Sequence, residues 1–222
     1  MEEDLDIQLL TQSEISPSDN YINFKIIIIG DSGVGKSCLL KRAVRNIFDG
    51  NYHATIGFEY LSMHFRVNDL KIKLQIWDTC GQELYRSLIQ GFYHNASLAI
   101  IVYDINQINS FKGLKIWHKD LKQNIEGDLP IFIIGNKNDL ERNVREEEAK
   151  KFRDENDIKY FTECSAKSGY KVKEIFYEAA KCLYHEYKKL NMKEIITIDK
   201  KLKLDKNVNK DNSNKNQNKK CC

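Results

Sequence analysis

The chain has 222 residues, of which 41% are hydrophobic and 30% are charged, and its formal net charge is +3. This length and composition are typical of one globular domain with extensions, and they exclude wholesale disorder. No apolar run approaches the roughly 18 residues needed to span a bilayer. Six cysteines without an apolar leader at Met1 favour free thiols in a reducing cytosol over a disulfide framework.

Charge is distributed unevenly along the chain. Residues 1–24 carry six acidic side chains and no Lys or Arg, whereas residues 191–222 carry nine Lys and four acidic side chains. We expect residues 1–23 to form a flexible acidic extension, residues 24–190 to form the folded domain, and the Lys/Asn-rich tail after them to be disordered. A basic tail suits nucleic acid or an anionic membrane equally, so charge alone leaves both partners open.

Short apolar runs predict the strands of a sheet that helices cover on both faces. In chain order, the predicted strands are 24–29, 61–67, 72–76, 97–103, 130–134 and 160–164, and the predicted helices begin near Lys36 and span 109–124, 145–157 and 172–190. The second and third strands alternate apolar and polar side chains around Asn68-Asp69, which predicts an antiparallel hairpin. The expected fold is therefore α/β, with a six-stranded, mostly parallel sheet, one antiparallel strand and helices on both faces.

Residues 30–37 read GDSGVGKS and lie between an apolar strand and a helix, which is the context that a phosphate-binding loop requires. Gly33 and Gly35 allow consecutive main-chain amides to turn towards phosphate oxygens, and the helix N-terminus adds its partial positive charge. Lys36 is predicted to reach the terminal phosphates, and Ser37 to hold Mg²⁺ through its hydroxyl. The loop predicts a bound nucleoside triphosphate but does not indicate the base.

The base is indicated by residues 136–139, which read NKND and follow an apolar strand. A carboxylate at Asp139 can accept hydrogen bonds from the ring N–H and the exocyclic amine of guanine, whereas adenine lacks the matching donors. Residues 164–167, which read CSAK, follow the last predicted strand and offer a main-chain amide to the guanine oxygen. Because these motifs occur in order at strand ends, they indicate a guanine nucleotide.

The ordered set GDSGVGKS, TIG, WDTCGQE, NKND and CSAK resembles the Ras superfamily of small GTPases, and the resemblance covers roughly Phe24 to Leu190. The resemblance implies that Thr55 binds Mg²⁺ over the γ-phosphate, that Asp78 binds this ion through water, and that the Gly81 amide senses the γ-phosphate. It also implies that Phe48 packs on the guanine and that Gln82 orients the attacking water. Catalysis would then consist of positioning and charge stabilisation rather than covalent chemistry.

The motifs and the resemblance together assign the nucleotide and its metal to one set of residues. The predicted nucleotide-binding residues are Ser32, Gly33, Val34, Gly35, Lys36, Ser37, Cys38, Phe48, Thr55, Gly81, Asn136, Lys137, Asp139, Ser165, Ala166 and Lys167. The predicted Mg²⁺ ligands are Ser37, Thr55 and Asp78, and Gln82 is the predicted catalytic residue. Cys38 is interpreted as lining the loop rather than as a nucleophile, because no motif places a His beside it. Trp117 is interpreted as ordinary helix packing.

Several segments, among them FEY at 58–60, FYHNA at 92–96 and IVYDIN, are similar to those that mark the Rab family. The effector contacts that this resemblance implies are Ile56, Gly57, Phe58, Tyr60, Trp77 and Phe92, of which the last three form an aromatic triad. TIGFEYLSMHF and SAKSGYKVKEIF are most similar to the Golgi-associated Rab subgroup numbered six. The chain departs from the family pattern at Cys80, where Ala is usual, and at Leu84-Tyr85, where Arg and an aromatic are usual.

The pair Cys221-Cys222 after the Lys-rich tail resembles the Rab double-geranylgeranyl signal and is not a C-a-a-X box. Two lipid chains attach a protein stably and a Lys-rich tail adds surface attraction, so the pattern favours a membrane over nucleic acid. The implied protein is a monomeric GDP/GTP switch on the cytoplasmic face of intracellular membranes, with the Golgi as the expected compartment, and with a cytosolic pool bound to a solubilising carrier. Its implied partners are GTP and GDP, an exchange factor, a GTPase-activating protein and effectors of vesicle trafficking.

Two alternatives stay open at this point. Cys80, beside the predicted γ-phosphate sensor Gly81, leaves room for a GTP-binding scaffold with little intrinsic hydrolysis. A phosphate loop also occurs in metabolic kinases and ATPases, but these need a second substrate site that the sequence does not indicate.

Overall fold

The computed structural model describes residues 4–50, 58–79, 91, 93–125 and 127–192. Contacts between residues divide the chain into the unit Met1–Leu183 and the unit Tyr184–Cys222. In the second unit, the described residues 184–192 are all helical. Within the described ranges, no helix combines the length and the apolar character needed to cross a membrane.

The unit Met1–Leu183 is built around a seven-stranded sheet with the strand order β1-β3-β4-β2-β5-β6-β7. The strands are β1 (Ile7–Leu9), β2 (Ile22–Ile29), β3 (Phe58–Val67), β4 (Leu70–Thr79), β5 (Leu98–Asp104), β6 (Ile131–Asn136) and β7 (Tyr160–Glu163). β3 is antiparallel to both β1 and β4, and the other neighbouring pairs are parallel. The predicted α/β fold, mostly parallel with one antiparallel strand, is confirmed.

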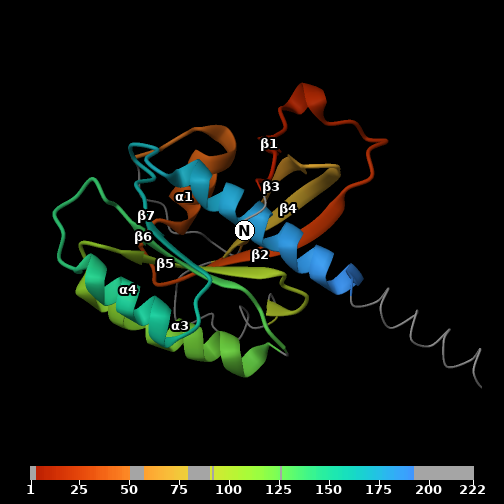
Figure 1. Cartoon of the computed structure of the whole chain (residues 1–222). Helices are drawn as coiled ribbons and strands as arrows, with labels where there is room; N and C mark the ends of the chain where they lie inside the picture. Colours follow the sequence, from red (N-terminus) through yellow and green to blue (C-terminus); the bar gives the residue numbers. More distant parts are fainter. Residues whose placement is uncertain (1–3, 51–57, 80–90, 92, 126, 193–222) are drawn as a thin grey trace, which may run out of the picture. The chain divides into compact units, whose positions relative to one another are not determined.

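Helices cover both faces of this sheet. The helices whose bounds lie within the described residues are α1 (Lys36–Arg45), α3 (Ile108–Asn124), α4 (Glu146–Glu155) and a helix over residues 172–192. A short 3-10 turn, η1 (Gln12–Glu14), follows β1. α3 and α4 lie side by side on one face, while α1 and the beginning of the last helix lie on the other (Figure 1). Because both faces are covered, every residue of the central strand β5 is buried.

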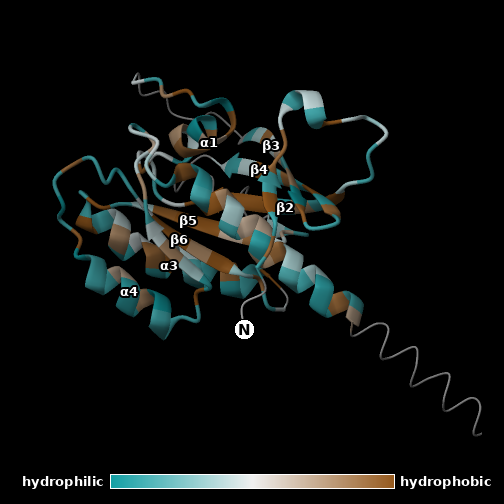
Figure 2. Cartoon of the chain, turned by 45° about the horizontal axis from the view of Figure 1, so that its top comes forward, coloured by the Kyte–Doolittle hydropathy of each residue, from teal (hydrophilic) through white to brown (hydrophobic). Residues whose placement is uncertain are grey.

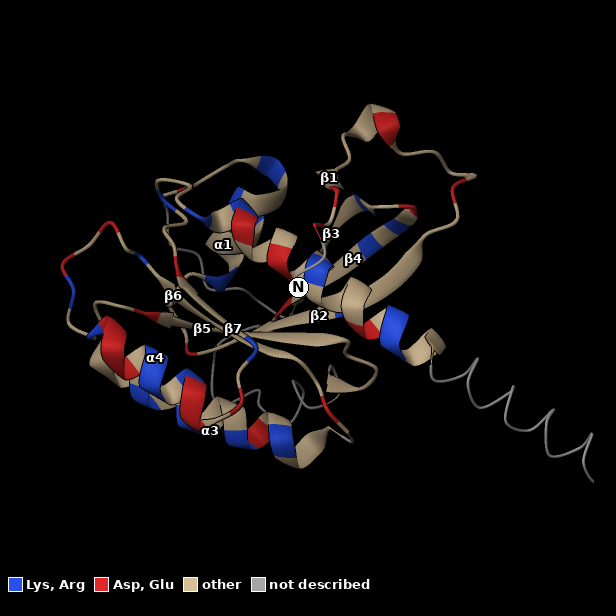
Figure 3. Cartoon of the chain, viewed as in Figure 1, with Lys and Arg blue, Asp and Glu red and all other residues tan. Residues whose placement is uncertain are grey.

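The core between the sheet and α3 and α4 is made of alternate strand residues. Ile27 and Ile29 of β2 and Ile101 of β5 pack in one cluster with Leu114 and Trp117 of α3. Figure 2 shows the central strands as strongly hydrophobic, and Figure 3 shows acidic and basic residues along α3 and α4. The helices are therefore amphipathic, and each buries its apolar side on the sheet.

The hairpin of β3 and β4 turns at Asn68-Asp69, as the sequence predicts. Asn68 has a positive φ of 52°, a conformation that Asn tolerates in tight hairpin turns. The register of the hairpin places Tyr60 directly opposite Trp77. The turn thus fixes which side chains meet across the two strands.

The predicted count of six strands is wrong, because β1 forms within residues 1–23, the segment predicted as a flexible extension. β1 pairs with β3, and just beyond it the Leu10 N–H donates a 2.8 Å hydrogen bond to the His64 carbonyl. At the other end, the Asn68 N–H donates to the Asp6 carbonyl, also at 2.8 Å. A strand of three residues carries no readable periodicity, and this one depends on a partner that lies far along the chain.

Candidate nucleotide-binding site

The predicted phosphate loop begins where β2 ends. Gly30 has a φ of +139°, and a Cβ added to it would lie 2.2 Å from the Val102 carbonyl oxygen of β5, so no larger residue fits. At the other end of the loop, Gly35 adopts a left-handed conformation as the N-cap of α1, and a Cβ added there would lie 2.4 Å from Asn136 Nδ2. The loop therefore leads directly into a helix N-terminus, which favours anions.

The Lys36 side chain folds back along this loop and is buried. Its Nζ donates hydrogen bonds of 2.8 Å to the main-chain carbonyls of Gly30 and Asp31. Both carbonyls belong to the loop, so the ammonium lies beside the main chain that is predicted to bind the phosphates. Such an ammonium can donate to phosphate oxygens at the same place.

The other predicted loop residues differ in exposure. Ser32 is exposed, Gly33 is half-buried and Val34 is fully buried. Cys38 is half-buried at the beginning of α1, and burial raises the pKa of its thiol. A raised pKa keeps the thiol protonated at neutral pH, which agrees with a lining role rather than a nucleophilic one.

Two of the three predicted Mg²⁺ ligands are in contact. The Ser37 hydroxyl donates a short hydrogen bond to Asp78 Oδ2. Asp78 is fully buried at the end of β4, and its other oxygen, Oδ1, has no hydrogen-bond partner among the described residues. Burial raises the pKa of Asp78 to about 6, although the Ser37 hydroxyl and the Lys36 ammonium act in the opposite direction. A buried carboxylate with one unpaired oxygen beside a hydroxyl fits a hard divalent cation, which prefers oxygen ligands.

Asn136, at the end of β6, connects the phosphate loop with the predicted base loop. Its Nδ2 donates a 2.9 Å hydrogen bond to the Val34 carbonyl, and its Oδ1 accepts one of 3.1 Å from the Ala166 N–H. Of the CSAK segment, which is predicted to offer a main-chain amide to the guanine oxygen, the Ala166 amide is thus engaged by Asn136 in this structure. The asparagine of NKND joins two loops that lie far apart in the sequence.

Asp139, the predicted base reader, is held by the base loop. Its Oδ1 accepts a 2.5 Å hydrogen bond from the Ser165 hydroxyl, and its Oδ2 lies 3.8 Å from Lys167 Nζ. Residues from NKND and from CSAK, predicted separately, therefore meet at one carboxylate. Fixed neighbours of this kind set the direction in which a carboxylate can accept hydrogen bonds.

Lys137 is fixed by an acidic partner that the sequence analysis missed. It has a positive φ of 69°, and its Nζ lies 2.7 Å from Oδ2 of Asp104, which is only 1% exposed. Asp104 is the last residue of β5, and its Oδ1 accepts a 2.9 Å hydrogen bond from the Asn106 N–H. A polar residue at the carboxyl end of a parallel strand was a signal that could have pointed to Asp104.

Arg42 is a second residue that the sequence did not single out. Its Nε donates a 2.9 Å hydrogen bond to the Ala166 carbonyl and its Nη2 a 2.7 Å bond to the Lys167 carbonyl. Its Nη1 donates to the Asn46 carbonyl at 3.1 Å, and its Cζ lies 6.0 Å from the ring centre of Phe48, which is partly exposed. Arg42 thereby connects the end of α1 with the base loop and with the aromatic predicted to pack on guanine.

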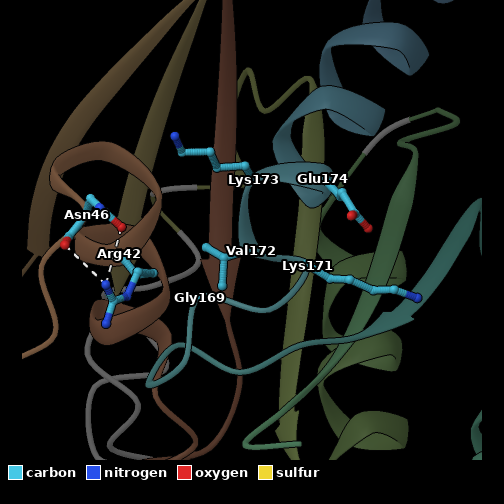
Figure 4. Close-up of a pocket in the computed structure, with 7 residues that line it drawn as sticks. All are labelled: Arg42, Asn46, Gly169, Lys171, Val172, Lys173 and Glu174. Carbon is cyan, nitrogen blue, oxygen red and sulfur yellow. Dashed lines mark hydrogen bonds between the residues drawn. The ribbon is translucent and has the colours of Figure 1, made fainter.

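A cavity of about 150 Å³ lies on another side of Arg42 (Figure 4). Its lining consists of Arg42, Asn46, Gly169, Lys171, Val172, Lys173 and Glu174. None of these lining residues is a predicted nucleotide-binding residue. The cavity is thus a neighbour of the base loop and not the predicted nucleotide site.

The predicted effector residues that the structure describes lie on the β3–β4 hairpin. Tyr60 is 40% exposed, and its ring centre lies 5.2 Å from that of Trp77. On the other side of β4 lies β2, and Nζ of its residue Lys25 is 5.6 Å from the Trp77 ring centre. Phe58 is the first residue of β3. Two of the three predicted triad residues therefore form one aromatic pair across two strands.

Several predicted residues lie outside the described part of the chain. They are Thr55, Ile56, Gly57, Gly81, Gln82, Phe92, Cys221 and Cys222, together with the side chain of Phe58 and the departures Cys80 and Leu84-Tyr85. Their roles stay predictions.

The chain matches a known protein family. A sequence model of the Ras family matches residues 25–185, well over half of the 222 residues. The matched range contains the phosphate loop, the NKND segment and the base loop described above. The chain therefore belongs to the Ras family of small GTPases.

Proposed function

We propose that the chain is a Rab-type GTPase that switches between GDP and GTP on intracellular membranes and recruits effectors for vesicle trafficking. Ras-family proteins in general bind GTP and GDP with Mg²⁺, interact with regulators and hydrolyse GTP, so this general activity follows from membership. The Rab type, the membrane and the trafficking role are the proposal.

The observation that carries the proposal is the aromatic pair of Tyr60 and Trp77. Tyr60 is 40% exposed on β3, close in sequence to Thr55 and therefore to the predicted first switch. Exposed aromatic side chains are common anchors of protein interfaces, because they bury a large area with few rotatable bonds. An effector that reads this pair together with the switch would recognise only one nucleotide state.

The same proposal assigns roles at the nucleotide. Ser37 and Asp78, with Thr55, would hold Mg²⁺, which supplies charge neutralisation at the β- and γ-phosphates. Lys36 would donate to the terminal phosphates, and Asp139 would accept from guanine. Gln82 would orient the water that attacks the γ-phosphate, so that slow hydrolysis limits how long effectors stay bound.

Membrane attachment is assigned to geranylgeranyl groups on Cys221 and Cys222, and the Golgi is the proposed compartment. Each buried lipid CH₂ contributes about 0.8 kcal/mol. A Lys near an anionic surface contributes about 1 kcal/mol, so two long chains outweigh the tail. The Lys-rich tail then strengthens an attachment that the lipids provide, and a solubilising carrier would keep a cytosolic pool.

The membrane part is tested with the double variant Cys221→Ser/Cys222→Ser. It should become cytosolic without a change in nucleotide affinity, and intact mass should show two geranylgeranyl groups on the wild type and none on the variant. Tagged protein compared with Golgi and endosome markers tests the compartment. A wild type that carries no lipid and still sediments with membranes would refute this anchor.

A GTP-binding scaffold with little hydrolysis is the second candidate, favoured by Cys80 in place of the usual Ala. Single-turnover hydrolysis of GTP by the purified chain separates the two, because a switch must turn over and a scaffold need not. Competition of GTP against ATP checks the guanine preference in the same preparation. Preference for ATP would exclude both candidates.

A further inference from the structure

Trp117 of α3 makes a polar contact with the phosphate loop in addition to its packing. The side chain is 1% exposed, and its Nε1 donates a 2.8 Å hydrogen bond to Asp31 Oδ1, across 86 residues of sequence. The indole nitrogen can only donate, so the direction of this bond is fixed. The helix that covers one face of the sheet (Figure 1) thus reaches the first residue after Gly30.

Gly113, one turn before Trp117 on α3, meets the same carboxylate. A Cβ added to Gly113 would lie 2.7 Å from Asp31 Oδ2 and 2.9 Å from Oδ1. Real Cβ atoms do not approach oxygen that closely, so a side chain at position 113 would displace the carboxylate. The Asp31 side chain therefore packs against α3 itself, beside the indole that donates to it.

The main chain of Asp31 is fixed as well. Its carbonyl accepts a 2.8 Å hydrogen bond from Lys36 Nζ. The preceding residue, Gly30, lies so close to the Val102 carbonyl that an added Cβ would be 2.2 Å from it. The beginning of the loop thus has contacts to β5 through Gly30, to Lys36 through the Asp31 main chain, and to α3 through the Asp31 side chain.

The charge of Asp31 gives this contact a role in binding. A carboxylate at the beginning of a phosphate-binding loop has the same sign as the phosphates and would weaken their binding if it could turn towards them. A donor on α3 stabilises the charge and restricts its direction. We propose that Trp117 is a positioning residue that, through Asp31, holds the phosphate loop in the conformation that binds a nucleoside diphosphate. This inference rests on the proposed nucleotide binding by residues 30–37.

The variant Trp117→Phe tests it, because Phe keeps an aromatic ring and lacks the N–H. We expect GDP affinity to fall about tenfold, the scale for loss of a hydrogen bond to a charged group. Affinity for GMP should change much less, because GMP lacks the β-phosphate that the loop would bind. The readout is the ratio of GDP to GMP affinity measured by competition, which a general loss of stability would not change.

Leu121→Val is the matched control. The Leu121 side chain is also buried on α3 and packs in the same core cluster. It should lower the unfolding temperature and leave the GDP to GMP ratio unchanged. In an Asp31→Ala background, Trp117→Phe should have no further effect on the ratio, because the partner is gone. An equal loss in both backgrounds would overturn the proposal.

Gly113→Ala gives an independent variant that keeps the indole. Ala favours a helix more than Gly does, so α3 should not be destabilised, yet the displaced carboxylate should lower the GDP to GMP ratio. Unchanged ratios in both Gly113→Ala and Trp117→Phe, with wild-type GDP binding intact, would overturn the inference alone. A wild type that binds no GDP would refute the nucleotide site, and the inference with it.

Discussion

The guanidinium of Arg42 donates a 2.9 Å hydrogen bond from Nε to the carbonyl of Ala166, 124 residues later in the chain. Its Nη2 donates to the next carbonyl, that of Lys167, at 2.7 Å. Because these two bonds come from one planar group, the end of α1 fixes two consecutive peptide units of the base loop. A residue of the first helix therefore fixes, through two main-chain carbonyls, the loop that is predicted to face guanine.

Arg42→Lys should speed GDP release about tenfold, because a single ammonium cannot reproduce the two parallel bonds and each is worth about 1 kcal/mol. Release of a fluorescent GDP analogue measures the rate. Arg45→Lys is the control, since Arg45 lies on the same helix and, among the described residues, its side chain forms a 3.9 Å surface ion pair with Glu59. If Arg42→Lys released GDP at the wild-type rate, the base loop would hold its conformation without Arg42.

Asp139→Asn should change the base that is preferred. An amide in place of the carboxylate can no longer accept from both the ring N–H and the amine of guanine, but it can donate to the extra oxygen of xanthine. GDP affinity should fall by about one to two orders of magnitude, as expected for hydrogen bonds to a charged group. Titrations with GDP and with xanthosine diphosphate measure both affinities. Ser165→Ala removes the 2.5 Å hydrogen bond to Asp139 and the 3.0 Å bond that the Ser165 hydroxyl accepts from the Ser168 N–H, but it keeps the carboxylate. It should therefore have a smaller effect on GDP and give no gain for xanthine.

Gln82→Leu should leave GTP binding intact and slow hydrolysis, because the attacking water loses the amide that orients it. Single-turnover hydrolysis of preloaded GTP gives the rate constant without interference from release. Glu83→Leu, at the next position, serves as a control for added apolar bulk in the same segment. Equal rates for wild type and Gln82→Leu would remove Gln82 from the catalytic assignment.

Gln8→Pro should loosen β1. The Asn68–Asp6 and Leu10–His64 hydrogen bonds lie two residues on either side, so the alternation of an antiparallel ladder assigns the Gln8 N–H to Arg66. Proline has no N–H to donate, whereas Gln8→Ala keeps it. Hydrogen exchange of the Leu10 and Asn68 amides should therefore accelerate in Gln8→Pro and stay near wild type in Gln8→Ala. The same protection in all three proteins would mean that β1 does not depend on this bond.

The parts of the fold that the sequence predicted are those with local patterns. The β3–β4 hairpin was predictable because apolar residues alternate on both sides of Asn68-Asp69, and β5 because an unbroken apolar run needs cover on two faces. The phosphate loop was predictable because GDSGVGKS lies between an apolar strand and a helix. The structure adds the reason for two of its glycines, since the main chain approaches Val102 and Asn136 too closely for a Cβ. In each case the signal is a pattern of residues that are close together in the sequence.

The missed contributions depend on contacts between distant segments. Trp117 was interpreted as packing, and only its approach to Asp31 across 86 residues gives it a polar partner. Arg42 has no motif of its own, and Asp104 acquires its role from Lys137, the residue that follows the neighbouring strand β6. A single sequence does not encode such pairs as a spacing, because the sheet topology decides which strand ends become neighbours.

β1 also limits where another chain could add a strand along β3, on one of the two edges of the sheet. An unpaired strand edge is a template for main-chain hydrogen bonds with any extended peptide. β1 occupies this edge opposite Phe65–Val67, and no described strand pairs with the same edge between Phe58 and Met63. A strand from another chain would therefore pair with the beginning of β3, the end that is closer to Thr55 in the sequence. By pairing with the far end of β3, the N-terminal strand would leave for backbone pairing the part of β3 that begins three residues after Thr55 in the sequence.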